Sequence, residues 1–203
     1  MQNVQSAMER LRGLATASPV AELAAAFEEA GFELALVGGP ARDGFLGRDV
    51  TDLDFTTNAR PDEILRIVTP IADAHWDIGR EFGTIGARFS GETVEITTYR
   101  ADSYDGTSRK PVVAFGDTIE GDLHRRDFTV NALALQLPGL TLVDPSDGTK
   151  DLIDATLRTP IEAAVSFGDD PLRMLRAVRF TSQLGFQLDV ASFDAIVELR
   201  RRI

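Results

Sequence analysis

The chain has 203 residues, enough for one large domain or two small ones. Hydrophobic residues make up 43% of it and charged residues 26%, a mixture typical of globular proteins, which excludes an intrinsically disordered chain. The longest apolar runs fall far short of the roughly 18 residues that a transmembrane helix needs, and no basic segment followed by an apolar run opens the sequence. We therefore expect a cytoplasmic protein with no membrane partner.

The residue counts limit the metal sites and nucleic-acid surfaces that the chain can offer. Without cysteine it forms neither a disulfide nor a thiolate zinc site, and two histidines exclude a histidine-rich cage, so any metal must be held by oxygen atoms. The net charge of -11 argues against a chain that grips nucleic acid over its whole surface. Residues 158–203 nevertheless hold seven Arg against six acidic residues, which indicates two functional regions.

Capping residues and apolar patterns predict the elements in chain order. After a polar lead, Ser18 and Pro19 are typical of the N-cap and first turn of a helix that runs through Ala30. Strands are predicted at 33–37, 53–56, 84–89, 93–99 and 140–143. Further helices are predicted at 40–46, 61–68, 126–135, 169–184 and 189–202. The combination of a hairpin with strands joined by helices favours a mixed sheet.

Two segments stand apart from this alternation. Residues 100–122 are polar, lack periodicity over most of their length and exceed the usual size of a connection, which favours a mobile functional loop. Beyond residue 150 the pattern predicts helices only. We therefore expect an α+β fold, with a mixed sheet and helices over residues 1–150 and an all-helical region over residues 151–203.

Asp52 and Asp54 alternate with Leu53 and Phe55 in the predicted strand at 53–56. Alternate side chains of a strand share a face, so the two carboxylates stand side by side while the apolar residues enter the core. Carboxylates at this spacing repel unless a cation lies between them, and hard oxygen ligands suit a partly hydrated Mg²⁺ that is shared with substrate phosphates. The alternative is a solvent-facing strand edge that happens to carry two Asp.

A glycine turn precedes this strand. Gly38 and Gly39 lie between a predicted strand and a predicted helix, where backbone N–H groups and the positive end of the helix dipole favour a phosphate. Taken alone, the pair could equally be a plain tight turn. Together with the two Asp it describes a place for a triphosphate and its metal ions, with Glu95 available as a third acid. Three carboxylates can hold two divalent ions that activate a hydroxyl and stabilise leaving pyrophosphate.

Five motifs support a more specific interpretation, and they lie at residues 36–43 with 52–54, 94–100, 122–132, 144–152 and 169–180. In this order they resemble the motifs of the nucleotidyltransferases related to DNA polymerase beta. The resemblance is closest to the class II tRNA nucleotidyltransferases, the CCA-adding enzymes, and to the bacterial poly(A) polymerases. It implies a polymerase beta-like nucleotidyltransferase head over residues 1–150 and a helical neck over residues 151–203.

The resemblance implies roles for the residues that match these motifs. Asp52 and Asp54 would bind metal, and Glu95 would be the third catalytic acid. The residues expected to bind the nucleotide are Gly38, Gly39, Arg42, Arg126, Asp127, Asn131, Asp170, Arg173 and Arg176. Helical spacing would put Asp127 and Asn131 on one face, and Arg is the natural bidentate partner of phosphate oxygens. A surface helix start with an ion pair is the alternative for this segment.

Asp170 and Arg173 lie one turn apart at the start of a predicted helix, so both can face one flat object. In the family this pair reads the Watson–Crick edge of the incoming base without a nucleic-acid template. A carboxylate acceptor beside an arginine donor would favour C and A over U and G. The alternative is an N-cap Asp with an ion pair to the residue three positions on. The family has Glu where this chain has the shorter Asp169.

Within the family, two segments favour the addition of C and A. Residues 79–85 are similar to the CCA-adding form, and residues 102–111 match the flexible loop of CCA- and A-adding members. The resemblance implies Mg²⁺ as cofactor, CTP and ATP as substrates, the 3′ end of tRNA or another RNA as partner, and release of pyrophosphate. The alternatives are a poly(A) or A-adding polymerase and a catalytically silent nucleotide- or RNA-binding module.

The end of the sequence lies inside a predicted helix whose apolar residues Phe193, Ile196 and Val197 have no expected partner. Members of the family are considerably longer, with helical regions beyond the neck that hold the tRNA. We therefore expect a catalytic head and the start of a neck, with much of the surface that grips RNA phosphates outside this chain.

Overall fold

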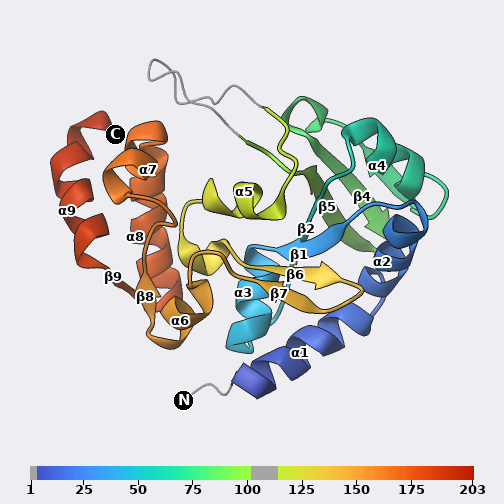
Figure 1. Cartoon of the computed structure of the whole chain (residues 1–203), viewed down its shortest axis with the longest axis horizontal. Helices are drawn as coiled ribbons and strands as arrows, with labels where there is room; N and C mark the ends of the chain where they lie inside the picture. The colour runs from blue at the N-terminus through green and yellow to red at the C-terminus, as the bar shows by residue number, and fades with distance from the viewer. Residues whose placement is uncertain (1–3, 102–113) are drawn as a thin grey trace.

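A computed structural model describes residues 4–101 and 114–203 (Figure 1). Its centre is a seven-stranded sheet in the order β3-β4-β5-β2-β1-β6-β7. The strands are β1 (Leu34–Val37), β2 (Leu53–Thr57), β3 (Ala74–Trp76), β4 (Thr84–Phe89), β5 (Glu92–Thr98), β6 (Ala134–Leu137) and β7 (Thr141–Val143). Because β2 and β5 are parallel and the other neighbours are antiparallel, the predicted mixed sheet and α+β class are confirmed.

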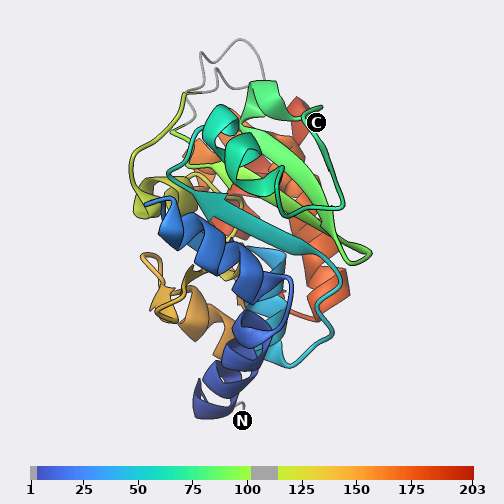
Figure 2. The same ribbon diagram turned by 90° about the vertical axis from the view of Figure 1, so that its right-hand side faces the viewer.

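Helices surround this sheet and follow it in the chain. They are α1 (Val4–Thr16), α2 (Val20–Glu29), α3 (Gly39–Leu46), α4 (Pro61–Val68), α5 (Ile119–His124), α6 (Gly148–Ile153), α7 (Ala163–Asp169), α8 (Leu172–Leu184) and α9 (Val190–Leu199). Figure 2 shows α1, α2 and α4 toward the viewer, with α8 and α9 behind the sheet. Of the helices in the described part of the chain, none is both long and apolar enough to cross a membrane.

The two faces of the sheet bury different side chains. In β1, Leu34 and Leu36 enter the larger apolar core, which α1 to α4 complete. Ala35 and Val37 point the other way, into a smaller cluster that includes residues of α5. The alternation of β1 therefore assigns the larger core to one face and leaves the face toward α5 for small and polar side chains.

Capping signals predicted several boundaries correctly. Helix α3 lies between Gly38 and Gly47, and α8 ends before Gly185. Gly47 and Gly185 have φ values of 70° and 74°, the left-handed region that glycine adopts most readily. Helix α9 follows Asp189, whose side chain accepts a hydrogen bond from the Ser192 N–H.

The N-terminal part of the prediction was wrong in two respects. The expected polar lead is α1, in which Ala7, Leu11 and Ala15 recur every four residues and are buried. Leu11 lies over Gly44 of α3, where the absence of a side chain admits it. Ser18 is not the N-cap of the next helix, because α2 begins at Val20 after Pro19 and has no side-chain cap.

The predicted helix at 126–135 was also wrong. This segment forms a short 3₁₀ turn, Thr129–Asn131, and then β6, which lies between β1 and β7. Pairing with two strands in the middle of the sheet outweighs the local helical pattern. The predicted loop at 100–122 includes the first four residues of α5, whose N-cap is Thr118, while residues 102–111 lie outside the described residues.

The region beyond residue 150 is not entirely helical, as it was predicted to be. Two short strands, β8 (Thr156–Leu157) and β9 (Gln187–Leu188), form a parallel pair. They bracket α7 and α8 in the sequence, and their pairing brings the two ends of this helical segment together. Sequence patterns cannot easily identify strands of two residues, because so short a run carries no period.

We expect Gly148→Ala to lower the free energy of unfolding by about 1–3 kcal/mol, because the new methyl group would overpack against backbone. A Cβ at Gly148 would lie 2.2 Å from the Thr129 carbonyl oxygen, in the turn that carries Asn131. Gly13→Ala is the control, since Gly13 lies in α1 with no atom within 4 Å of the new Cβ. Urea denaturation should show that Gly13→Ala leaves the free energy of unfolding unchanged or raises it. Equal effects of Gly148→Ala and Gly13→Ala would contradict the expected clash.

Candidate functional site

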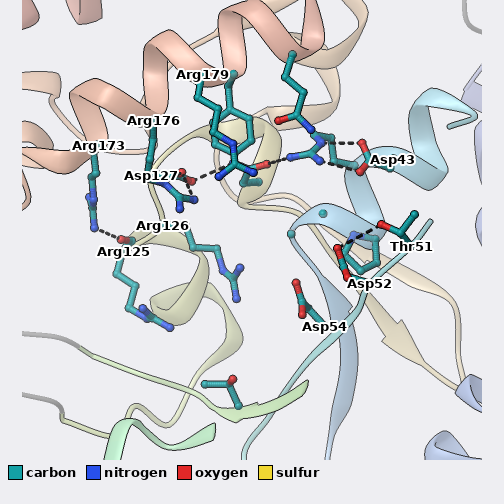
Figure 3. Close-up of a pocket in the computed structure, with 18 of the residues that line it drawn as sticks. Asp43, Thr51, Asp52, Asp54, Arg125, Arg126, Asp127, Arg173, Arg176 and Arg179 are labelled. Carbon is teal, nitrogen blue, oxygen red and sulfur yellow. Dashed lines mark hydrogen bonds and ion pairs between the residues drawn. The ribbon is translucent and has the colours of Figure 1, made fainter. Parts of the chain in front are cut away.

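A hollow of about 630 Å³ lies between the sheet and α8, which lines it from Arg173 to Gln183. Figure 3 shows acidic side chains from the β2 region on one side of it and arginines of α8 and the α5 end on the other. Eleven of the twelve residues predicted from the sequence line it: Gly38, Gly39, Arg42, Asp52, Asp54, Arg126, Asp127, Asn131, Asp170, Arg173 and Arg176. Glu95 lines an adjoining hollow of about 730 Å³, which Asp52 and Asp54 also reach.

Strand β2 places the aspartate pair as its alternation predicts. Leu53 and Phe55 are buried in the larger core, while Asp52 is exposed and Asp54 half-buried on the opposite face. Glu95 is the register partner of Asp54 on the parallel strand β5. The structure therefore brings all three carboxylates to the adjoining hollow, while Asp52 and Asp54 also line the first one.

The electrostatics of Asp54 follow from this crowding. Burial, together with the negative charges of Glu95 and Asp52, raises the pKa of Asp54 to about 6, and the positive charge of Arg126 opposes the rise. When the pKa of a carboxyl group is raised in this way, a cation that enters stabilises the charged form of the group. The pair therefore has a chemical reason to take up a positive ion.

The side chains here fit a hard divalent ion that also takes ligands from a substrate. Asp52 and Asp54 supply oxygen atoms, which Mg²⁺ prefers, and the chain contains no cysteine. Among the residues that the structure describes, no three His, Asp or Glu side chains are arranged as a complete metal cage. A partial set of ligands suits Mg²⁺, which usually keeps waters and binds through one or two carboxylates plus phosphates.

The glycine turn forms the floor of the hollow beside α3. Gly38 has a φ of 71°, and a Cβ there would lie 3.1 Å from Nη1 of Arg126. Both observations favour glycine, which adopts this conformation and allows the guanidinium close to the backbone. The first turn of α3 follows directly, so its unpaired N–H groups are available to an anion in the hollow.

A hydrogen-bonded chain of charged groups crosses the hollow from α8 to α3. Arg176 donates through Nε and Nη2 to Oδ2 of Asp127, at 2.7 and 2.6 Å. Oδ1 of Asp127 accepts from Nδ2 of Asn131 at 3.1 Å, and Oδ1 of Asn131 accepts from Arg42 at 2.6 Å. Arg42 also forms two hydrogen bonds with Asp43. Asp127 and Asn131 thus meet as expected, although through a turn rather than a helix.

The ring of Phe180 organises three of the arginines. The guanidinium carbons of Arg42, Arg176 and Arg179 lie 5.4, 5.4 and 5.8 Å from its centroid, within cation–π range. Arg179 lines the hollow but was not among the predicted site residues. Its spacing of three residues from Arg176 was the available signal, since positions three apart are neighbours on the helix surface.

Asp170 and Arg173 both line the hollow, but they are held separately. Asp170 accepts a hydrogen bond from the Leu172 N–H just before α8, whose N-cap is Pro171. Arg173 is buried and donates to Oγ of Ser166 at 2.8 Å and to the Arg125 carbonyl at 2.6 Å. Among the described residues Asp170 is not the N-cap and the two side chains form no ion pair with each other, so the alternative of an N-cap Asp with an i+3 ion pair is not observed.

Comparisons with known proteins identify the class to which this fold and site belong. The described chain superposes on the Bacillus stearothermophilus CCA-adding enzyme in complex with CTP with a TM-score of 0.78, at 36% identity over 90% of this chain and 44% of that one. It therefore has the fold of a nucleotidyltransferase head. A family model for the Poly A polymerase head domain matches residues 34–158, and the chain belongs to this family.

Two further relatives agree with this assignment. The CCA-adding enzyme of Geobacillus thermodenitrificans is 42% identical over 168 residues, which are 82% of this chain and 40% of that enzyme. A tRNA nucleotidyltransferase solved with a primer tRNA and an incoming ATP analogue has a TM-score of 0.73 at 30% identity, over 88% of this chain and 50% of that one. The chain spans about two fifths of the length of the curated relatives that it matches.

We expect Asp54→Asn to stabilise the metal-free protein at pH 8 but not at pH 4. The folded-state pKa of about 6 exceeds the ordinary value of 3.8, so the proton on Asp54 favours folding. That contribution is fully present below pH 3.8 and is lost as the pH rises through about 6. At pH 8 the difference in unfolding free energy should be at most ~3 kcal/mol, since one pKa unit corresponds to about 1.4 kcal/mol.

Thermal unfolding in EDTA at the two pH values measures this difference. Asp194→Asn is the control, because Asp194 is exposed on α9 and away from the hollow. The control should show the same small change at both pH values. A melting temperature of Asp54→Asn that does not exceed that of the wild type at pH 8 would contradict the expected burial of charge.

Proposed function

We propose that the chain is the catalytic head and first neck segment of a CCA-adding tRNA nucleotidyltransferase. It would add C and A to the 3′ end of tRNA from CTP and ATP with release of pyrophosphate. The convergence of the aspartate pair, the glycine turn and the arginines of α8 on one hollow carries this proposal. The names of the relatives and the family match at residues 34–158 support it. In this proposal residues 1–150 are the head and residues 151–203 are the neck.

The residues around the hollow divide the work of holding the substrate. Asp52 and Asp54 would hold Mg²⁺, with Glu95 as a further acid beside them. When bound, Mg²⁺ neutralises charge on phosphate oxygens and lowers the pKa of a hydroxyl group. The N–H groups of Gly39 and Ala41 in the first turn of α3 would donate to the triphosphate, since the Gly38 N–H already donates to the Leu133 carbonyl, and Arg126 lies against the turn.

The remaining contacts concern the sugar and the phosphates that leave. Arg42 and Arg176 line the hollow, and Asn131 and Asp127 hold them in place. Fixed guanidinium groups stabilise the charge that develops on a departing pyrophosphate without reorganising during the reaction. Asp127 is occupied by hydrogen bonds from Arg176 and Asn131. This supports a role for Asp127 in positioning these residues rather than in proton transfer.

The base would be read by Asp170 and Arg173. Cytosine and adenine carry an exocyclic amine on the Watson–Crick edge, and this amine can donate a hydrogen bond to a carboxylate. The ring nitrogen beside the amine can accept a hydrogen bond from a guanidinium. Uracil and guanine carry a carbonyl oxygen in place of that amine. This oxygen and the carboxylate are both acceptors, so no hydrogen bond could form between them. A rigid Arg173 favours this discrimination, and two hydrogen bonds anchor that side chain.

A poly(A) polymerase is the second candidate, since the matching family model carries that description. It would take ATP alone and extend RNA repeatedly. A silent binding module is the third. Incubation with a tRNA that lacks its terminal CCA separates the three: a proposed CCA-adding head requires CTP before ATP, a poly(A) polymerase uses ATP alone, and a silent module incorporates neither.

We expect Asp54→Ala to abolish Mg²⁺-dependent incorporation from CTP, with a loss on the order of 100-fold or more, because it removes a proposed metal ligand. Incorporation of labelled CMP into tRNA that lacks CCA measures this. The control is Glu22→Ala, an exposed residue at the start of α2 that should leave the rate unchanged. Retention of wild-type activity in Asp54→Ala would disprove the assignment of the metal site.

Arg173→Ala should abolish the preference for CTP and ATP over UTP and GTP while leaving Mg²⁺-dependent binding of triphosphates in place. Arg173 is expected to contact the base, whereas the glycine turn and Arg126 contact the phosphates. Calorimetric titration with the four triphosphates tests this. A variant that binds all four less well but keeps the same order of preference would argue against the role of Arg173 in reading the base.

A further inference from the structure

Asp122 is a fully buried carboxylate that no step of the proposed reaction uses. It lies on α5 between Ile119 and Leu123, which anchor that helix in the smaller apolar cluster. Its side chain has no exposed surface. A buried charge of this kind is costly unless it is paired and hydrogen-bonded, so its contacts indicate what it is for.

Both carboxylate oxygens of Asp122 are occupied by protein groups. Oδ1 accepts from Nε and Nη2 of Arg125, at 2.9 and 2.7 Å, and from the Arg100 N–H at 3.2 Å. Oδ2 accepts from Nη2 of Arg126 at 3.1 Å and from Oγ1 of Thr56 at 3.3 Å. Because every contact is internal and the group is buried, Asp122 does not face the hollow, and any effect on a substrate must pass through its partners.

Arg126 is the partner that reaches the hollow. Asp122 is the one hydrogen-bond partner of its side chain within residues 4–101 and 114–203. Its Nη1 lies beside Gly38, and its charge acts on Asp54. Its Nε is buried without a hydrogen-bond partner among the described residues. One side-chain partner thus holds Arg126 among the described residues, and its Nη1 lies beside the glycine turn.

The position of Asp122 fits this task. Thr56 follows Asp54 by two residues on β2, so both side chains project from the same face of the sheet. The Thr56 hydroxyl, which lies 3.3 Å from both the Thr97 carbonyl oxygen and Asp122, therefore connects Asp122 to the strand that carries Asp54. The Arg126 side chain thus lies between Asp122 and the glycine turn. Figure 3 shows that it also points toward Asp54.

We propose that Asp122 is a positioning residue, whose carboxylate holds the Arg126 guanidinium between the Gly38 turn and Asp54, ready for the triphosphate of the incoming nucleotide. The proposal rests on the proposed nucleotidyltransferase function. An arginine that is fixed before binding loses less side-chain freedom when it contacts phosphate, which raises affinity. Asp122 then contributes to phosphate recognition without touching the substrate.

The test compares nucleotides that differ only in phosphate number. Titration of the protein with CTP and with CMP, in the presence of Mg²⁺, gives the ratio of the affinity for CTP to the affinity for CMP. We expect Asp122→Asn to lower this ratio about tenfold, as Arg126→Ala does, because both changes act on the same guanidinium. In the Arg126→Ala background, Asp122→Asn should have no further effect, as a double-mutant cycle requires of two residues that act through one contact.

Asp151→Asn is the matched control. Asp151 is similarly buried, pairs with Arg158 at 2.9 Å and Thr129 at 2.6 Å, and does not line the hollow. It should lower thermal stability and leave the ratio unchanged. If Asp122→Asn does not fold, Thr56→Val weakens the same anchor and should lower the ratio by about twofold to threefold, since it removes one weaker contact.

The outcomes separate this inference from the proposed function. A wild-type protein that binds no CTP would overturn the proposed function itself. Binding by the wild type with an unchanged ratio in a folded Asp122→Asn variant would overturn the inference alone. An equal loss of affinity for CTP and CMP would do the same, because it would show a general structural role.

Discussion

The alternation of side chains along β2 is the constraint on which the site depends. Leu53 and Phe55 must enter the larger core, and this fixes Asp54 and Thr56 on the opposite face. Parallel pairing with β5 then sets Glu95 beside Asp54. A slip of one residue would bury the carboxylates and expose the apolar pair, so core packing and the register of the acids are one requirement.

Acidic groups near the hollow have two different uses. Asp52, Asp54 and Glu95 lie together, and burial, followed by the charges of Glu95 and Asp52, raises the pKa of Asp54 although Arg126 opposes the rise. Asp122 and Asp127 are instead paired with arginines. Burial alone would raise the pKa of Asp122, but Arg126 and Arg125 outweigh burial and hold that pKa below its ordinary value. The chain is therefore acidic overall and basic at one wall of the hollow, where an anionic substrate would lie.

The sequence was sufficient to predict those parts of the site that lie within a single strand, turn or helix. The aspartate pair, the glycine turn, the helix α3 and the end of α8 follow from spacing and capping, which are local; the start of α8 was predicted at residue 169 but lies at Leu172, because α7 ends at Asp169. The helix expected at 126–135 failed because β6 is determined by pairing with β1 and β7, which local patterns do not contain. The contacts of Asp127 with Arg176 and of Arg42 with Asn131 join residues 49 and 89 positions apart, so they required the fold.

Arg125 connects the two ends of the proposed substrate site. Its guanidinium binds Asp122, the same carboxylate that holds Arg126, while its carbonyl oxygen accepts a hydrogen bond from Arg173. The group proposed to contact the phosphates and the group proposed to read the base are thus held by Asp122 in α5 and by Arg125 at its C-cap, three residues further on. Arg125 and Arg126 share one planar peptide unit, so the carbonyl that accepts from Arg173 and the backbone of Arg126 move together. Contacts of a base with Arg173 would therefore be transmitted to the backbone of Arg126, which would link base choice to the placement of the triphosphate.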